Sequence, residues 1–245
     1  MSRVVVGALA ALSLAALASA QSPLVAELRE FSTRYHEDPA RLDSFREGLD
    51  RAAAADPRAD NLIAVAQISF MWGDVRARTR DDKLAAYDRG RQAARRAVEL
   101  EPRNAIAHFW LATNTARWGQ TNGIVRSLFL LPDVQREIRT VLDLDPGFTP
   151  VYALAGNVYA EVPSLLGGDL ARAEEMFRAG LAKDPHYTLL RLGLGKTLLK
   201  RGRRDEARRE LTAVVDERAP TNPADWTVKD VPEARRLLGG LRGRG

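Results

Sequence analysis

Four dipeptides, each an acidic residue followed by proline, divide the chain and limit it to helices of moderate length. Proline lacks the backbone N–H that a helix interior needs, and it pushes the preceding residue out of the helical conformation. Each dipeptide follows a stretch with helical spacing of apolar residues, so each marks the end of a helix. The four are Asp56-Pro57, Glu101-Pro102, Asp145-Pro146 and Asp184-Pro185.

The distances between these prolines indicate a repeat. Successive prolines lie 45, 44 and 39 residues apart, and Pro220 follows Pro185 by 35 residues. A tetratricopeptide repeat is a pair of antiparallel helices with a period of about 34 residues that ends in such a proline. The alternating Val/Ile/Thr runs typical of strands are missing. The sequence therefore predicts an all-α, tetratricopeptide-like helical-hairpin solenoid of about ten helices over residues 21–220. A C-terminal tail over 221–245 is predicted to carry one short helix, from Val231 to Leu238.

Small residues recur where paired helices of such a repeat must approach closely. Gly156 and Gly195 occupy this position in two predicted first helices, and Ala207 occupies the matching position in a second helix. The segment Gly167-Gly168-Asp169 fits a turn followed by a helix start, because glycine permits positive φ and Asp169 can cap the helix from Leu170 to Lys183. The alternative is a loop that contacts a partner.

The first twenty residues have the pattern of a secretory signal. A basic start at Arg3 precedes an apolar run from Val4 to Ala18, and small residues then lead to Ala20. The run is shorter than the ~20 residues of a membrane-spanning helix. We expect residues 1–20 to be a signal peptide cleaved after Ala20, and the mature chain to be periplasmic or secreted without stable membrane insertion.

The composition argues against catalysis and nucleic-acid binding. The chain has no cysteine and three isolated histidines, so thiolate chemistry is excluded and a metal centre is not expected. The segment Gly193–Thr197 lacks the upstream glycine of a phosphate-binding loop. The formal net charge is +5, and the arginines are interleaved with acids instead of forming one stripe. We expect a non-enzymatic protein with no cofactor, no metal and no nucleic-acid partner.

Two groups of apolar residues are candidates for binding a partner or ligand. Aromatic residues of the first helices would lie on the inner surface of the array, either packed in its core or lining a groove. The insertion from Thr121 to Asp133 carries Leu128 and Phe129 outside the repeat pattern, either as a cover of the core or as a patch that binds a partner or a like subunit. The aromatic candidates are Phe109, Trp110, Trp118, Tyr152 and Tyr159.

Several segments together resemble the T-component (TatT-like) family of tripartite TRAP transporters. They are Ala107–Ala112, Trp118-Gly119, Leu142–Pro146 and the Pro163-x-x-x-Gly167-Gly168-Asp169 segment, within a match from about Ala59 to Val215. The resemblance implies a periplasmic α-helical repeat protein that forms trimers with an apolar internal passage and binds the solute-binding protein of the transporter. Unlike a lipid-anchored protein, this chain has no cysteine to carry a lipid. The other interpretation is a generic periplasmic scaffold for envelope assembly.

Overall fold

The computed structural model describes residues 22–242, and within them it is all-helical. The predicted signal peptide and its cleavage point lie outside these residues. The first half comprises α1 (Pro23–Phe31), α2 (Arg41–Ala55), α3 (Ala59–Val75), α4 (Arg80–Leu100), α5 (Ala105–Asn122) and α6 (Ile124–Leu144). The second half comprises α7 (Thr149–Glu161), the 3₁₀ turn η1 (Ser164–Leu166), α8 (Leu170–Lys183), α9 (Thr188–Lys200), α10 (Arg204–Asp216), α11 (Pro223–Asp225), the π-helical turn η2 (Trp226–Asp230) and α12 (Val231–Arg242).

The acid–proline dipeptides terminate helices as the sequence predicted. Asp56, Glu101, Asp145 and Asp184 are the C-caps of α2, α4, α6 and α8, and each has left the helical conformation, with φ between −132° and −143°. The next helix then begins within five residues of each dipeptide. The pairs α3/α4, α5/α6, α7/α8 and α9/α10 therefore form consecutive antiparallel hairpins, which confirms the predicted tetratricopeptide-like solenoid.

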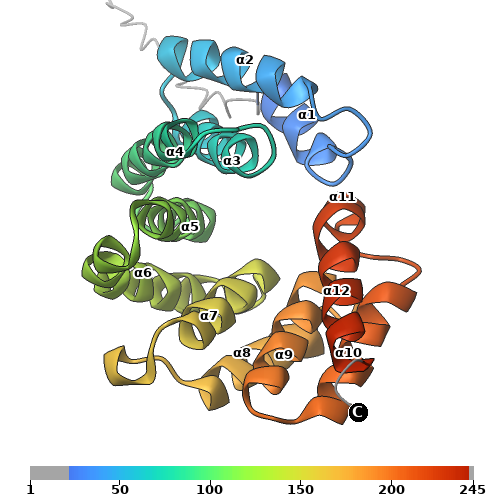
Figure 1. Cartoon of the computed structure of the whole chain (residues 1–245). Helices are drawn as coiled ribbons and strands as arrows, with labels where there is room; N and C mark the ends of the chain where they lie inside the picture. The colour runs from blue at the N-terminus through green and yellow to red at the C-terminus, as the bar shows by residue number, and fades with distance from the viewer. Residues whose placement is uncertain (1–21, 243–245) are drawn as a thin grey trace, which may run out of the picture.

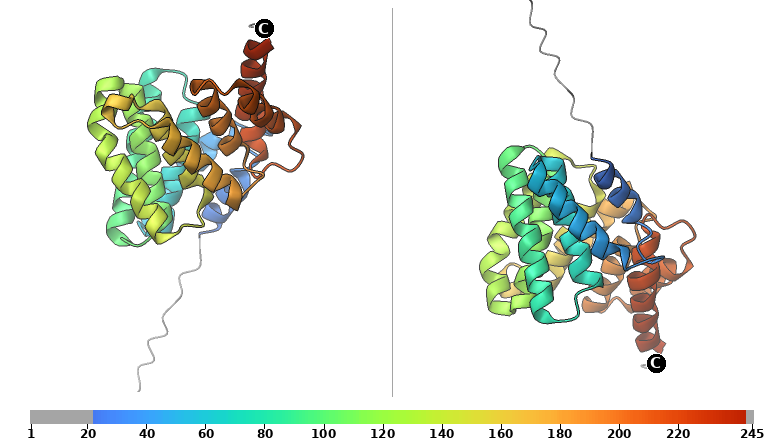
Figure 2. Two further views of the ribbon diagram at one scale, coloured as in Figure 1. Left: turned by 90° about the horizontal axis from the view of Figure 1, so that it is seen from below. Right: turned by 90° about the horizontal axis from the view of Figure 1, so that it is seen from above.

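The hairpins curve until the two ends of the solenoid meet. Figure 1 shows the helices arranged as a ring, with α11 returning beside α1. A backbone hydrogen bond joins these ends, because the amide of Ala224 donates to the carbonyl oxygen of Thr33 at 2.9 Å. The views from above and below in Figure 2 show α12 extending away from the body of the ring.

The helix in the C-terminal tail is longer than the predicted segment from Val231 to Leu238. It continues through Gly239 and Gly240 to Arg242. The reason is a packing contact, since Leu241 is buried in a small apolar cluster with Leu192 and Leu211. Burial of this side chain keeps the last turn helical despite two glycines.

Close packing in the C-terminal half depends on residues with small side chains or none. A Cβ atom on Gly156 would lie 2.6 Å from the Phe177 ring, and one on Gly195 would lie 2.9 Å from Leu211. Ala207 is fully buried. These residues lie where the repeat register placed them, and they allow α7, α8, α9 and α10 to approach each other.

Candidate binding site in the centre of the ring

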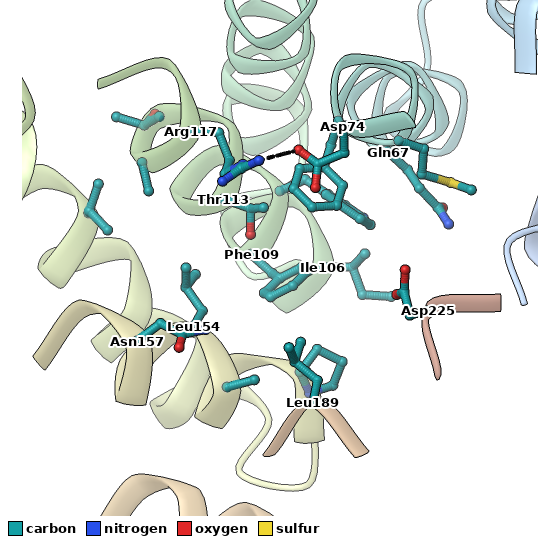
Figure 3. Close-up of a pocket in the computed structure, with 18 of the residues that line it drawn as sticks. Gln67, Asp74, Ile106, Phe109, Thr113, Arg117, Leu154, Asn157, Leu189 and Asp225 are labelled. Carbon is teal, nitrogen blue, oxygen red and sulfur yellow. Dashed lines mark hydrogen bonds and ion pairs between the residues drawn. The ribbon is translucent and has the colours of Figure 1, made fainter. Parts of the chain in front are cut away.

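The ring encloses a cavity of about 770 Å³, shown in Figure 3. Its wall comes mainly from the first helix of each hairpin, α3, α5, α7 and α9, together with α1 and the segment that contains α11 and η2. The second helices α4, α8 and α10 lie outside it, whereas α6 contributes several side chains. The volume is within the range of about 300–1,000 Å³ that holds small-molecule ligands.

One side of the cavity is apolar. Ile106 and Phe109 face it from α5, Leu154 faces it from α7 and Leu189 from α9 (Figure 3). The Phe109 ring is fixed by edge-to-face contacts with Phe148, at 5.0 Å between ring centroids, and with Trp110 at 5.1 Å. This wall presents hydrocarbon and aromatic surface in a fixed geometry.

The opposite side has a polar centre at Asp74, near the end of α3. Its carboxylate accepts hydrogen bonds from the Tyr87 hydroxyl at 2.6 Å and from Arg117 at 2.5 Å, and it lies 3.6 Å from the ammonium of Lys229. Burial alone would raise the pKa of Asp74, but the positive charges of Arg117 and Lys229 outweigh it and lower this pKa. Asp74 thus stays ionised and connects α3 to α4, α5 and η2.

A second polar group has no partner. The Thr113 side chain is 7% exposed and lines the cavity between Phe109 and Arg117, and its hydroxyl makes no hydrogen bond to any described residue. Leaving a buried hydroxyl without a hydrogen-bond partner costs about 1–3 kcal/mol of folding free energy. Gln67 and Asn157 also face the cavity, as Figure 3 shows. A bound molecule could therefore place polar groups at Gln67 and Asn157 while its apolar part contacts the apolar wall.

The side of the cavity formed by α11 and η2 carries further charged side chains. Asp225 accepts a hydrogen bond from the Tyr35 hydroxyl at 2.7 Å and pairs with Lys229 at 2.9 Å. Asp230 accepts a hydrogen bond from Thr188 at 2.7 Å. Burial raises the pKa of Asp230 to about 6, which outweighs the lowering by that hydrogen bond.

The cavity brings together two of the five aromatic candidates, Phe109 and Trp110. Tyr152 is packed in the core, where its hydroxyl donates to the Pro146 carbonyl at 2.8 Å. Trp118 makes cation–π contacts with the guanidinium groups of Arg91 and Arg126, and Tyr159 makes one with Arg172. Trp118, Tyr152 and Tyr159 do not line the cavity.

The insertion from Thr121 to Asp133 has one face toward the cavity and another that is exposed. Leu130 and Leu131, on one face of α6, line the cavity. On the other face Phe129 is 76% exposed and Val125 is 65% exposed, and Ile124 at the start of the helix is 67% exposed. Leu128 is half-buried between these faces.

The Gly167-Gly168-Asp169 segment is a turn followed by a helix cap. Gly167 has φ of +96°, and a Cβ on Gly168 would overlap the carbonyl oxygen of Val162. The Asp169 carboxylate accepts hydrogen bonds from the amides of Ala171 at 2.8 Å and Arg172 at 3.1 Å. Hydrogen bonds from Arg172 and Ala171 lower the pKa of Asp169. The local backbone therefore accounts for these three residues without a partner.

Sequence reasoning missed Asp74, Thr113, Arg117 and the charged residues of α11 and η2. A signal existed for Asp74 and Arg117, since each is a charged residue near the end of a largely apolar first helix. Within residues 22–242 no group of three or more acidic or histidine side chains could hold a metal ion. No helix in the same range is both long and apolar enough to cross a membrane.

Comparison with known proteins supports the fold. Residues 165–238 match the family model for the tetratricopeptide repeat. A thermophilic TPR protein from Thermus thermophilus aligns with 86% of this chain and 95% of its own length, at 19% identity and a TM-score of 0.63. MamA from Desulfovibrio magneticus is less similar, at 15% identity over 79% of this chain and 94% of its own, with a TM-score of 0.48. No curated protein matches the chain. The chain thus has a TPR-like fold, an architecture that generally serves as a scaffold for protein interaction.

Proposed function

We propose that this chain is an exported, non-enzymatic binding protein that serves as an accessory component of a tripartite (TRAP) solute transporter. In this role it binds the transporter's solute-binding protein and accommodates the solute in the cavity of the ring. Residues 1–20 direct export and are removed after Ala20, which places the mature chain in the periplasm. The proposal extends the resemblance of the chain to the T-component family.

The observation that carries the proposal is the cavity of the ring, with one apolar and one polar side. A TPR-like scaffold that only binds a peptide needs an open concave surface, whereas here the helices curve into a ring around the cavity. Phe109 and Leu154 offer an apolar wall, and Gln67 and Asn157 offer polar side chains that face the same space. This combination suits an amphipathic or largely apolar solute.

The outer face of α6 supplies a candidate contact for the solute-binding protein or for a like subunit. Phe129 and Val125, one turn apart on this face, expose 76% and 65% of their surface, which is unusual for apolar side chains of this size. Large exposed apolar side chains that gather on one helix commonly anchor a protein interface. A trimer, as the family resemblance implies, would use such a face.

Co-purification from the periplasm tests the proposal. The tagged full-length chain should begin at Gln21 after export, and mild cross-linking should recover a solute-binding protein. Phe129→Asp should abolish that recovery without unfolding the chain, because the side chain is 76% exposed. The matched control Leu165→Asp removes a side chain that is 97% exposed on η1 and should leave recovery unchanged.

The outcomes separate the proposal from its alternative. Recovery of envelope assembly factors instead of a solute-binding protein would favour the generic scaffold. Retention of the chain in the cytoplasm with its first residue intact would contradict export.

A further inference from the structure

The ring is closed by residues 222–230, which we call the clasp. Its base belongs to the C-terminal half of the molecule. The indole N–H of Trp226 donates to the Val214 carbonyl at 2.8 Å, and Asp230 accepts the Thr188 hydroxyl at 2.7 Å where both side chains are fully buried. The clasp is therefore firmly attached to α9 and α10.

The tip of the clasp crosses to the N-terminal half through a small set of contacts. The amide of Ala224 donates a hydrogen bond to the Thr33 carbonyl at 2.9 Å, and Asp225 accepts a hydrogen bond from the Tyr35 hydroxyl at 2.7 Å. The Lys229 ammonium lies 3.6 Å from Asp74 and faces the rings of Tyr35 at 5.7 Å and Phe70 at 6.0 Å. Residues Thr33, Tyr35, Phe70 and Asp74 make up the docking surface of the clasp.

These contacts differ in kind from those between neighbouring hairpins. Adjacent hairpins share continuous clusters of buried apolar side chains. Across the seam, Ala224 is the only residue beyond position 107 that joins the buried N-terminal cluster within the described part of the chain. The other contacts described above are hydrogen bonds, ion pairs and the contacts of Lys229 with two aromatic rings. The Lys229 and Asp225 side chains stay partly exposed, so water can replace their polar contacts.

The clasp also forms part of the cavity wall. Asp225, Lys229 and Asp230 line the cavity from the clasp, and Tyr35 and Asp74 line it from the docking surface. The cavity is already partly open, since its lining includes the exposed side chain of Ile106. Separation of these two surfaces would widen its opening at the seam without breaking any hairpin. Weakly packed polar contacts are the parts of a structure that open most readily.

We propose that the clasp is a dissociable wall, and that its separation from the docking surface widens the access to the cavity through the seam beside residues 222–230. Lys229 is the residue that holds the seam closed, because it contacts Asp74, Tyr35 and Phe70 together. This inference rests on the proposed role of the cavity as a binding site, but its first test does not require a ligand.

The first test uses the absence of cysteine from the sequence. A single Thr113→Cys substitution places one thiol at a buried position on the cavity wall. Its rate of alkylation by iodoacetamide, followed by intact-mass spectrometry, measures access to the cavity. Adding Lys229→Met should raise this rate about five- to tenfold, the effect expected from losing an ion pair and its ring contacts.

The matched control is Lys200→Met in the same background. Lys200 pairs with Glu161 at 2.9 Å and donates to the Ala160 carbonyl, away from the seam. Its loss should leave the alkylation rate unchanged. Equal rates in the Lys229 and Lys200 variants, whether raised or not, would overturn the proposal, because access would then not depend on the clasp.

A second test locks the seam. The hydrogen bond between the Ala224 amide and the Thr33 carbonyl brings the two backbones into contact, so this pair is the choice for an engineered disulfide across the seam. In the Thr33→Cys/Ala224→Cys variant, oxidation should slow the binding and release of the amphipathic dye 1-anilinonaphthalene-8-sulfonate at least tenfold, and reductant should restore both rates. Unchanged rates with the disulfide formed would refute entry through the seam. Failure of the dye to bind the unmodified protein would count against the cavity as a binding site, and the alkylation rates would still decide whether the clasp opens.

Discussion

Phe177 lies between two glycines, and this arrangement gives a sharp prediction for Gly193→Ala. The ring is fully buried, and an added Cβ at Gly193 would lie 2.3 Å from its Cε1 atom. The ring cannot move away, because Gly156 already approaches it so closely that a Cβ there would lie at 2.6 Å. Overpacking of this kind costs about 1–3 kcal/mol, and a ring confined on both sides favours the upper end of that range. The better helix propensity of alanine offsets about 1 kcal/mol of this loss in stability.

The net expectation is a loss of about 2 kcal/mol, which in a domain of this size lowers Tm by about 4–8 °C. Thermal melting followed by circular dichroism at 222 nm measures the shift. Gly239→Ala is the matched control, because nothing lies within 4 Å of its added Cβ and the helix gain is unopposed. That variant should be slightly more stable than the parent.

A double substitution identifies the cause. Phe177→Leu destabilises by itself, since it removes buried surface. In combination with Gly193→Ala it should cost less than the sum of the two single changes, because the smaller side chain makes room for the methyl group. Additive losses, or a Gly193→Ala variant as stable as the parent, would refute the reasoning.

Three further predictions concern polar groups. Asp169→Ala should lower the melting temperature in a thermal melt, because the amides of Ala171 and Arg172 lose their cap. Burial raises the pKa of Asp230 to about 6, above its value of about 3.9 in an unfolded chain, so its contribution to stability falls as pH rises from about 4 to about 6. The free energy of unfolding of the Asp230→Asn variant, relative to that of the parent, should therefore rise by about 2–3 kcal/mol between pH 4 and pH 7, as measured by urea unfolding. Glu174→Gln should lose about 1–3 kcal/mol in the same assay, because this buried carboxylate is shared by Arg178, Arg201 and Arg203.

The sequence predicted the local features of the fold because their causes are local. An acidic residue before proline ends the helix that precedes it, and Asp56 and Asp145 did so independently of their surroundings. The two-residue glycine turn before Asp169 also depends only on neighbouring backbone. These features needed no knowledge of the tertiary structure.

The candidate site was harder to predict because its residues meet only through the curvature of the array. Periodicity places both Phe109 and Tyr152 on the inner faces of their helices. Phe109 lines the cavity, whereas Tyr152 is packed in the core. Tyr35 and Asp225, which meet at the seam, are 190 residues apart. Small rotations between successive hairpins determine such contacts, and no single segment of sequence encodes them.

Closure of the ring also constrains how this architecture can change. An open solenoid tolerates the gain or loss of a repeat, because each unit contacts only its neighbours. Here, removal of one hairpin would carry Ala224 away from Thr33 and leave both ends of the array uncovered. The number of repeats is therefore fixed by geometry, as the number of strands is fixed in a closed barrel, and variation is confined to the outer helices and the loops between them.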